Sequence, residues 1–104
     1  MENRRGFERF PTQREAQFFL IKGRGWGQEC TIINVSRKGL GIIFRTNEEI
    51  DVGTNIRLEV PDPLTPDTID IRGELRWSEE IGGGFVGGIE LSRTLSDVKF
   101  SKLA

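Results

Sequence analysis

Two short groups of residues in this 104-residue chain have side chains suited to holding an anion. The first is an arginine pair near the N-terminus, Arg5 and Arg9. A guanidinium is planar and permanently charged, so it can donate two parallel hydrogen bonds to a phosphate or stack on a flat ring. Residues four apart lie on one side of the backbone, about 6 Å apart in a helical turn or about 13 Å apart in an extended chain. Either conformation lets both side chains reach one ligand, although a solvated basic tail would have the same spacing.

The second group is Asn34, Ser36 and Gly39, which follows one apolar run and precedes another. The side chains of Asn and Ser both donate and accept hydrogen bonds, and two residues apart they point to the same side of a strand. Gly39 can adopt a positive φ and lets a partner approach closely. The same residue types also build an ordinary structural turn, so this group alone does not establish a binding site.

The sequence offers little for catalysis. It contains no histidine, which excludes Ser-His and Cys-His nucleophile pairs and any metal site built on histidine. The single cysteine, Cys30, falls within a predicted strand, where we expect a small buried hydrophobe and not a nucleophile. A lone cysteine also excludes an internal disulfide and fits a reducing compartment. We therefore expect a protein that is not an enzyme and that has no metal and no cofactor.

The charges are unevenly distributed along the chain. Residues 1–38 carry eight Lys or Arg and four Asp or Glu, whereas residues 39–104 carry seven and twelve. This asymmetry indicates an anionic partner for the first third, unless folding interleaves the two sets of charges. A pI near 5.5 disfavours duplex nucleic acid as that partner. No apolar run approaches the roughly 20 residues of a membrane span, and the N-terminus does not resemble a secretory signal, so we expect a cytoplasmic protein without membrane insertion.

The distribution of turn residues predicts a flexible arginine-rich arm over residues 1–14 and a single β-barrel domain over residues 15–104. Strands are predicted at residues 15–22, 28–35, 40–46, 55–60, 69–77 and 85–91. Six short strands separated by turns indicate an all-β antiparallel barrel or sandwich, and closure into a barrel leaves no exposed edge. Within residues 69–77 the alternation places one set of side chains inward: Ile69, Ile71, Gly73, Leu75 and Trp77.

The C-terminal residues show helical spacing of apolar side chains at Leu95, Val98 and Leu103. Thr94 with Asp97 three residues later resembles a capping box, which predicts a helix start there. A helix of about ten residues is marginally stable alone, so we expect it to dock on the barrel.

Taken together, Arg5-x-x-x-Arg9 and Asn34-x-Ser36-x-x-Gly39 resemble the signature of the PilZ domain family, R-x-x-x-R followed by [D/N]-x-S-x-x-G. The resemblance extends over residues 4–103. It includes residues 72–77, which are similar to the family's strand with a glycine and a tryptophan, and residues 84–91, which are similar to its last strand. The fold that it implies is a six-stranded antiparallel PilZ-type β-barrel with a short C-terminal helix.

The resemblance implies that the chain binds the bacterial second messenger cyclic di-GMP. Arg5 and Arg9 would then clamp phosphates and guanine edges, Asn34 and Ser36 would contact the ligand from the barrel, and Gly39 would shape the turn. Arg4 and Lys38 are further candidates. The charge of Arg4 would help to hold a stacked dimer of the ligand, and Lys38 would add long-range attraction. Ligand binding would order the arm, and the arm would present a new surface to an unidentified downstream protein.

Two alternatives remain open at this stage. The chain could be a PilZ-like interaction module that works through protein contacts without binding a nucleotide, although such modules usually have a broken signature. It could also be a small barrel that binds single-stranded nucleic acid, which needs exposed aromatic side chains along a basic groove. Trp26 is the only candidate for such a side chain, because Trp77 is predicted to face inward and the chain has no tyrosine. Nucleic acid is therefore the weaker alternative.

Overall fold

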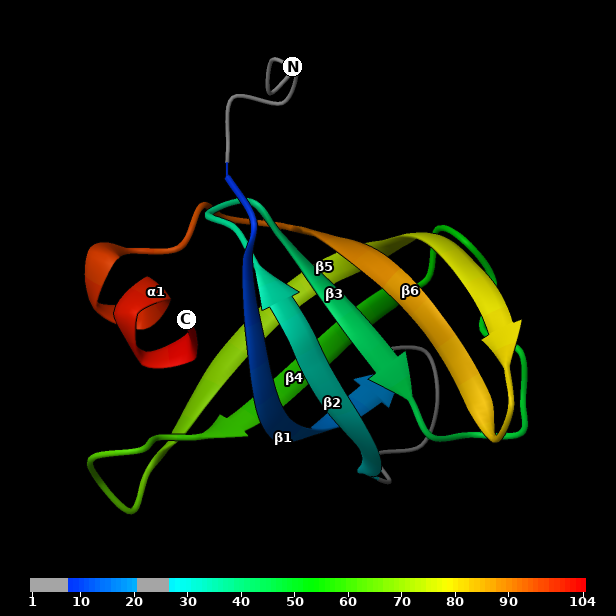
Figure 1. Ribbon diagram of the computed structural model, residues 1–104, viewed down its shortest axis with the longest axis horizontal. Helices are drawn as coiled ribbons and strands as arrows, with labels where there is room; N and C mark the ends of the chain where they lie inside the picture. Colours follow the sequence, from blue (N-terminus) through cyan, green and yellow to red (C-terminus); the bar gives the residue numbers. More distant parts are fainter. Residues whose placement is uncertain (1–7, 21–26) are drawn as a thin grey trace.

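The computed structural model describes residues 8–20 and 27–104, and in them six antiparallel strands form a closed barrel with one short helix at the C-terminus (Figure 1). The strands follow the barrel in the order β1-β2-β3-β6-β5-β4. Their bounds are β1 Phe10–Leu20, β2 Gln28–Val35, β3 Gly39–Phe44, β4 Asn55–Pro61, β5 Thr68–Ile81 and β6 Gly84–Leu91, and the helix α1 is Asp97–Leu103. The predicted all-β barrel with a C-terminal helix is thus confirmed.

Alternate side chains of the strands fill the interior of the barrel. Phe18 of β1 and Phe44 of β3 are fully buried, and their rings meet edge to face with centroids 5.0 Å apart. Ile71 and Leu75 of β5 are buried beside them in the same core, as the alternation predicts. Cys30 is also fully buried in β2, so its predicted role as a small hydrophobe is confirmed.

The first strand begins earlier than predicted. β1 starts at Phe10 and pairs with β2 through Phe10 opposite Val35 and Pro11 opposite Asn34. Residues 10–14, expected in the arm, therefore belong to the barrel. The sequence suggested a break at Pro11, but the pairing register shifts just after it, and proline is tolerated at such an irregularity. Of the predicted arm, residues 1–7 lie outside the described residues.

A β-bulge in β5 reverses the side on which its last residues lie. Leu75 is opposite Ile89 of β6, but Trp77 is opposite Gly88, so two steps along β5 match one step along β6. One extra residue moves every following side chain to the other face of the sheet. The prediction that Trp77 faces inward is therefore wrong: 48% of the residue's surface is exposed.

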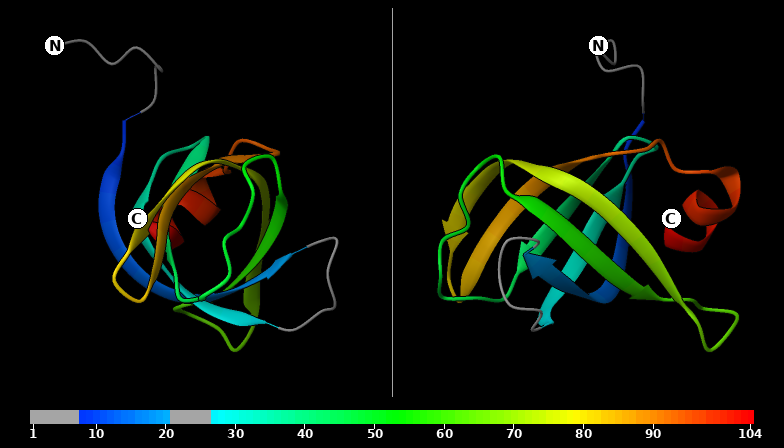
Figure 2. Two further views of the ribbon diagram at one scale, coloured as in Figure 1. Left: turned by 90° about the vertical axis from the view of Figure 1, so that its right-hand side faces the viewer. Right: turned by 180° about the vertical axis from the view of Figure 1, so that it is seen from behind.

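The helix α1 begins later than predicted and has a different cap. Ser96 is the N-cap, and its hydroxyl accepts a hydrogen bond from the backbone N–H of Lys99. Thr94, the predicted cap, lies in the segment before the helix. Figure 2 shows that α1 lies across one end of the barrel. No helix in the described part of the chain is long and apolar enough to cross a membrane.

Contacts from three directions hold α1 against the barrel end. Leu103 is fully buried, and its carbonyl accepts a hydrogen bond from the Thr12 hydroxyl of β1 at 2.8 Å. The rings of Phe100 and Phe10 meet edge to face at 5.5 Å. Lys102 forms a 2.6 Å ion pair with Asp62, and this hydrogen bond holds the pKa of the Asp62 carboxyl below its ordinary value. The helix is therefore docked on the barrel, as its short length requires.

Because α1 is docked on the barrel, two side-chain truncations on this helix should lower the free energy of unfolding by different amounts. Leu103→Ala should lower the free energy of unfolding by about 2–5 kcal/mol, because it leaves a cavity under α1. Val98→Ala is the matched control, since Val98 is 63% exposed and its loss should cost less than about 0.5 kcal/mol. Urea denaturation monitored by circular dichroism measures both. Equal losses would contradict the docking of α1.

Candidate ligand site

Ser36 closes the turn between β2 and β3. Its backbone N–H donates to the carbonyl of Gly39 at 2.9 Å, and its hydroxyl accepts from the backbone N–H groups of Gly39 at 3.0 Å and Lys38 at 3.3 Å. Only 3% of the residue is exposed. The hydroxyl thus satisfies backbone donors that the tight turn would otherwise leave buried without partners. Ser36 fixes the shape of the turn.

The positive φ that the sequence suggested for Gly39 is not observed, since the described glycines with positive φ are Gly53 and Gly83. The lack of space around position 39 explains the glycine there instead. A Cβ at position 39 would lie 3.0 Å from the carbonyl oxygen of Ile89 and 3.5 Å from the guanidinium of Arg9. A side chain here would push the turn away from β6 or displace Arg9, so glycine allows the close approach.

Arg9 lies directly over this turn. Its guanidinium donates a hydrogen bond to the Asn34 side-chain carbonyl at 2.8 Å. The side-chain amide of Asn34 lies against Gly41 of β3. A Cβ at Gly41 would come within 2.5 Å of the Asn34 amide nitrogen. The structure therefore joins Arg9 and Asn34, one from each sequence group. Arg5 and Arg4 lie outside the described residues, so their part in the site stays a prediction.

An open pocket of about 530 Å³ lies between this turn and the bulged part of β5. Small-molecule sites commonly have volumes of this size. Its lining residues come from the two predicted groups and from β5 and β6: Arg9, Ser36, Lys38, Gly39, Arg76, Trp77, Gly88, Ile89 and Glu90. Lys38, a further candidate from the sequence, thus lines the pocket. Asn34 does not line it and is linked to it through Arg9.

Trp77 is the principal lining residue that sequence reasoning missed. Its indole lies across Gly88 of β6, where a Cβ would overlap the ring. An aromatic side chain laid over a glycine on the neighbouring strand shields the exposed backbone and fixes the ring. The signal in the sequence was Gly88, which leaves room on the outer face for one large side chain from β5. The bulge then aims the indole into the pocket.

The cationic residues of the pocket outnumber its one carboxylate. Arg76 forms an ion pair with Glu90 at 2.5 Å, and the hydrogen bond between them raises the pKa of the Arg76 guanidinium. Because Glu90 is held by Arg76, its charge is partly neutralised within the pocket. Arg9 and Lys38 add two further positive charges. A planar ring and a net positive charge on one surface suit a ligand that has both phosphates and flat bases.

The described residues show no arrangement for metal or thiol chemistry. No group of three or more Asp, Glu or Cys side chains in residues 8–20 and 27–104 is placed to hold a metal ion. Burial in the barrel raises the pKa of the Cys30 thiol to about 12, so the thiol stays protonated at neutral pH.

Comparisons with known proteins identify the family and the fold. The PilZ domain matches residues 3–103, and the chain therefore belongs to the PilZ domain family. Among solved structures, the fold is similar to that of the Bacillus subtilis inhibitor of motility, MotI/DgrA, with a TM-score of 0.69 and 17% sequence identity. The match covers 98% of this chain and 49% of that one, so the chain spans about half the length of its structural neighbour. A search of curated protein sequences found no match.

The role of Ser36 in the turn predicts a stability effect from a small substitution. Ser36→Ala should lower the free energy of unfolding by about 1–3 kcal/mol, because two buried backbone N–H groups lose their acceptor. Ser101→Ala, on the exposed side of α1, is the matched control and should change it by less than about 0.5 kcal/mol. Urea denaturation of both variants measures the difference. Indistinguishable midpoints would mean that the hydroxyl does not hold the turn.

Proposed function

We propose that this chain is a non-enzymatic receptor for cyclic di-GMP that passes the signal to a downstream protein. The observation that carries the proposal is that Arg9, Lys38, Arg76 and the exposed Trp77 line one pocket on the family's motif turn. Cyclic di-GMP has two phosphates, which suit the cations, and two guanines, which suit the indole. Membership of the PilZ domain family supports the same ligand.

Each residue has a distinct part in this proposal. Arg9 donates to a phosphate or to a guanine edge, and Arg5 joins it from the arm. Asn34 accepts from Arg9 through its carbonyl, which leaves its N–H₂ group to donate to the ligand. Ser36 and Gly39 act by holding the turn in place, since the Ser36 hydroxyl is occupied by backbone groups. Lys38 and Arg4 add positive charge around the phosphates.

The number of cations favours a stacked dimer of the ligand. Two copies bring four negative charges to one site, and their mutual repulsion has to be offset by nearby cations. Arg9, Lys38 and Arg76 lie at the pocket, and Arg4 and Arg5 precede them in sequence. We therefore expect two molecules of cyclic di-GMP to bind each chain.

A titration by isothermal calorimetry tests the proposal. Cyclic di-GMP should bind with micromolar or tighter affinity at two per chain, whereas GTP and a single-stranded oligonucleotide should not. Arg5→Ala, Arg9→Ala and Trp77→Ala should each weaken binding by about tenfold or more, because each removes a charge-assisted hydrogen bond or a stacking face. Arg45→Ala is the matched control, because Arg45 is an exposed cation that does not line the pocket, and this variant should bind as the wild type does.

Three results would count against this reading. Absence of cyclic di-GMP binding by the intact chain favours a PilZ-like module that works through protein contacts alone. Equal binding of the oligonucleotide favours a nucleic-acid-binding barrel, for which the outward Trp77 now supplies a stacking face. Saturation at one ligand per chain would leave the receptor in place and exclude the stacked dimer.

The arm is proposed to order when cyclic di-GMP binds, and partial proteolysis tests this. Trypsin cleaves after Arg4, Arg5 and Arg9, and contact of these side chains with the ligand's phosphates should slow cleavage several-fold, because the bound chain opens less often. GTP at the same concentration serves as the control. Equal cleavage rates with and without cyclic di-GMP would refute the ordering of the arm while leaving the binding titration unaffected.

A further inference from the structure

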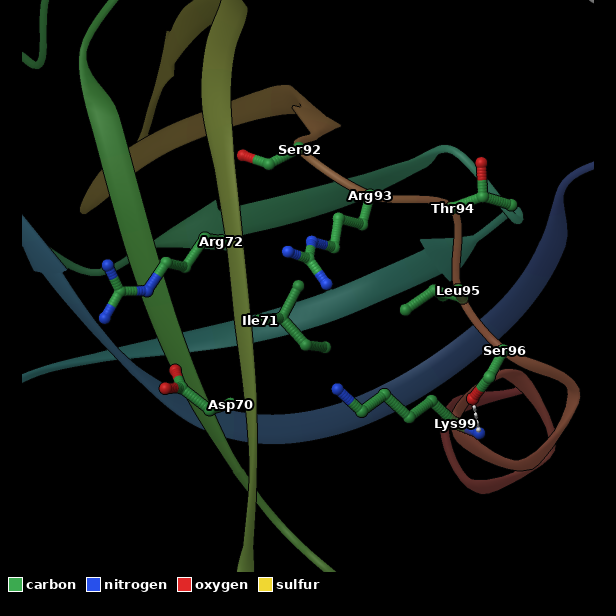
Figure 3. A pocket seen from close by; sticks show the side chains of 9 residues that line it. All are labelled: Asp70, Ile71, Arg72, Ser92, Arg93, Thr94, Leu95, Ser96 and Lys99. Atoms are coloured by element: carbon green, nitrogen blue, oxygen red, sulfur yellow. Dashed lines mark hydrogen bonds between the residues drawn. The ribbon is translucent and has the colours of Figure 1, made fainter.

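A second cleft, of about 460 Å³, lies between β5 and the segment that runs from the end of β6 into α1 (Figure 3). It shares no residue with the ligand pocket described above. Nine residues line it: Asp70, Ile71, Arg72, Ser92, Arg93, Thr94, Leu95, Ser96 and Lys99. The cleft is open to solvent.

Two cations are aimed into this cleft without a charge to balance them. In Figure 3 the side chain of Arg93 extends from the segment toward β5, and that of Lys99 extends toward β5 from α1. Neither side chain has an ion pair or a hydrogen-bond partner within the part of the chain that the structure describes. Asp70 lies on the other side of β5 in this view, and it faces Arg57 at 3.7 Å. The cleft therefore has an unbalanced positive charge.

The floor between these two cations is apolar. Ile71 of β5 and Leu95 of the segment point toward each other there, and both belong to the barrel core. The hydroxyls of Ser92 and Thr94 lie along the rim and are exposed. A bare phosphate would use the cations and leave the apolar floor unused. A peptide that alternates carboxylates with an apolar side chain would use both.

We propose that this cleft docks an acidic, extended segment of the downstream protein, with carboxylates on Arg93 and Lys99 and an apolar side chain over Ile71 and Leu95. The proposal deepens the receptor function, because it names the chemistry of the partner to which the signal passes. The cleft is open, which lets a stretch of extended chain enter it from solvent.

The cleft is bonded directly to the turn of the ligand site. The backbone N–H of Leu95 donates to the carbonyl of Arg37 at 2.8 Å, and that of Leu91 donates to the carbonyl of Lys38 at 2.8 Å. The Arg37 guanidinium adds a 2.6 Å ion pair with Asp97 at the start of α1. A ligand that shifts residues 36–39 must therefore shift one wall of the cleft. By linkage, the acidic segment and cyclic di-GMP should change each other's affinity by the same factor.

Heteronuclear NMR on the full chain tests the docking. The probe is a ten-residue peptide with four glutamates around a central leucine, and the control peptide has lysine in place of each glutamate. The glutamate peptide should shift the amide signals of residues 92–99. The Arg93→Gln, Lys99→Gln double variant should weaken its binding by about tenfold, since two charge contacts are lost. The charge-preserving variant Arg93→Lys, Lys99→Arg is the matched control and should bind within about twofold of wild type.

The same samples separate failure of this inference from failure of the receptor function. Shifts at residues 92–99 with the glutamate peptide support the docking whether or not cyclic di-GMP binds. No shifts there, or equal shifts with the lysine peptide, overturn the docking even if cyclic di-GMP binds normally. Equal shifts and equal affinity with inorganic phosphate alone would also overturn it, because they would show a small-anion site. If cyclic di-GMP binds but the affinity of the glutamate peptide is the same with and without cyclic di-GMP, the proposed coupling between the two sites is wrong.

Discussion

The hydrogen bonds with which Ser36 closes the turn between β2 and β3 hold together parts of the molecule that are far apart in sequence. The turn carries Gly39, whose missing side chain lets Arg9 and β6 approach. Its two middle carbonyls, those of Arg37 and Lys38, accept from the segment that leads into α1. Residues of the ligand pocket and of the second cleft are therefore joined by hydrogen bonds through one short turn. A displacement of this turn should therefore alter the shape of both the ligand pocket and the second cleft.

Pairing of the acidic residues explains how a chain with a net charge of −1 presents two cationic surfaces. Glu90 is held by Arg76, Asp97 by Arg37, and Asp62 by Lys102, so much of the negative charge is matched within the barrel and at the helix. Surface ion pairs of this kind add little stability. Their consequence here is electrostatic: Lys38, Arg93 and Lys99 have no such partner within the described residues and face the two openings. The sequence predicted an anionic partner for the first third alone, but Arg76 of β5 also reaches the pocket.

The sequence alone predicted the fold and the side of the pocket that Arg9 and the turn at residues 36–39 form. Period-two alternation in residues 69–77 predicted the buried side chains Ile71 and Leu75, and the turn residues separated the six strands. The alternation failed at Trp77, because a bulge depends on pairing with β6, which no single strand reveals. The helix cap was misplaced for a similar reason. Thr94 and Ser96 are both competent caps, and the contacts of Leu95 and Arg37 decide between them.

The early start of β1 changes the energetics proposed for the arm. Ordering a residue costs roughly 1–2 kcal/mol of backbone entropy, so an arm of fourteen residues would oppose ligand binding strongly. Residues 10–14 are paired with β2, and Arg9 is hydrogen-bonded to Asn34, all through contacts within the chain itself. Within the proposed ordering of the arm, residues 10–14 therefore add nothing to the cost that a ligand must offset. Arg9 is thus the member of the predicted arginine pair that a hydrogen bond to Asn34 holds at the turn, and the part proposed for Arg5 stays a prediction.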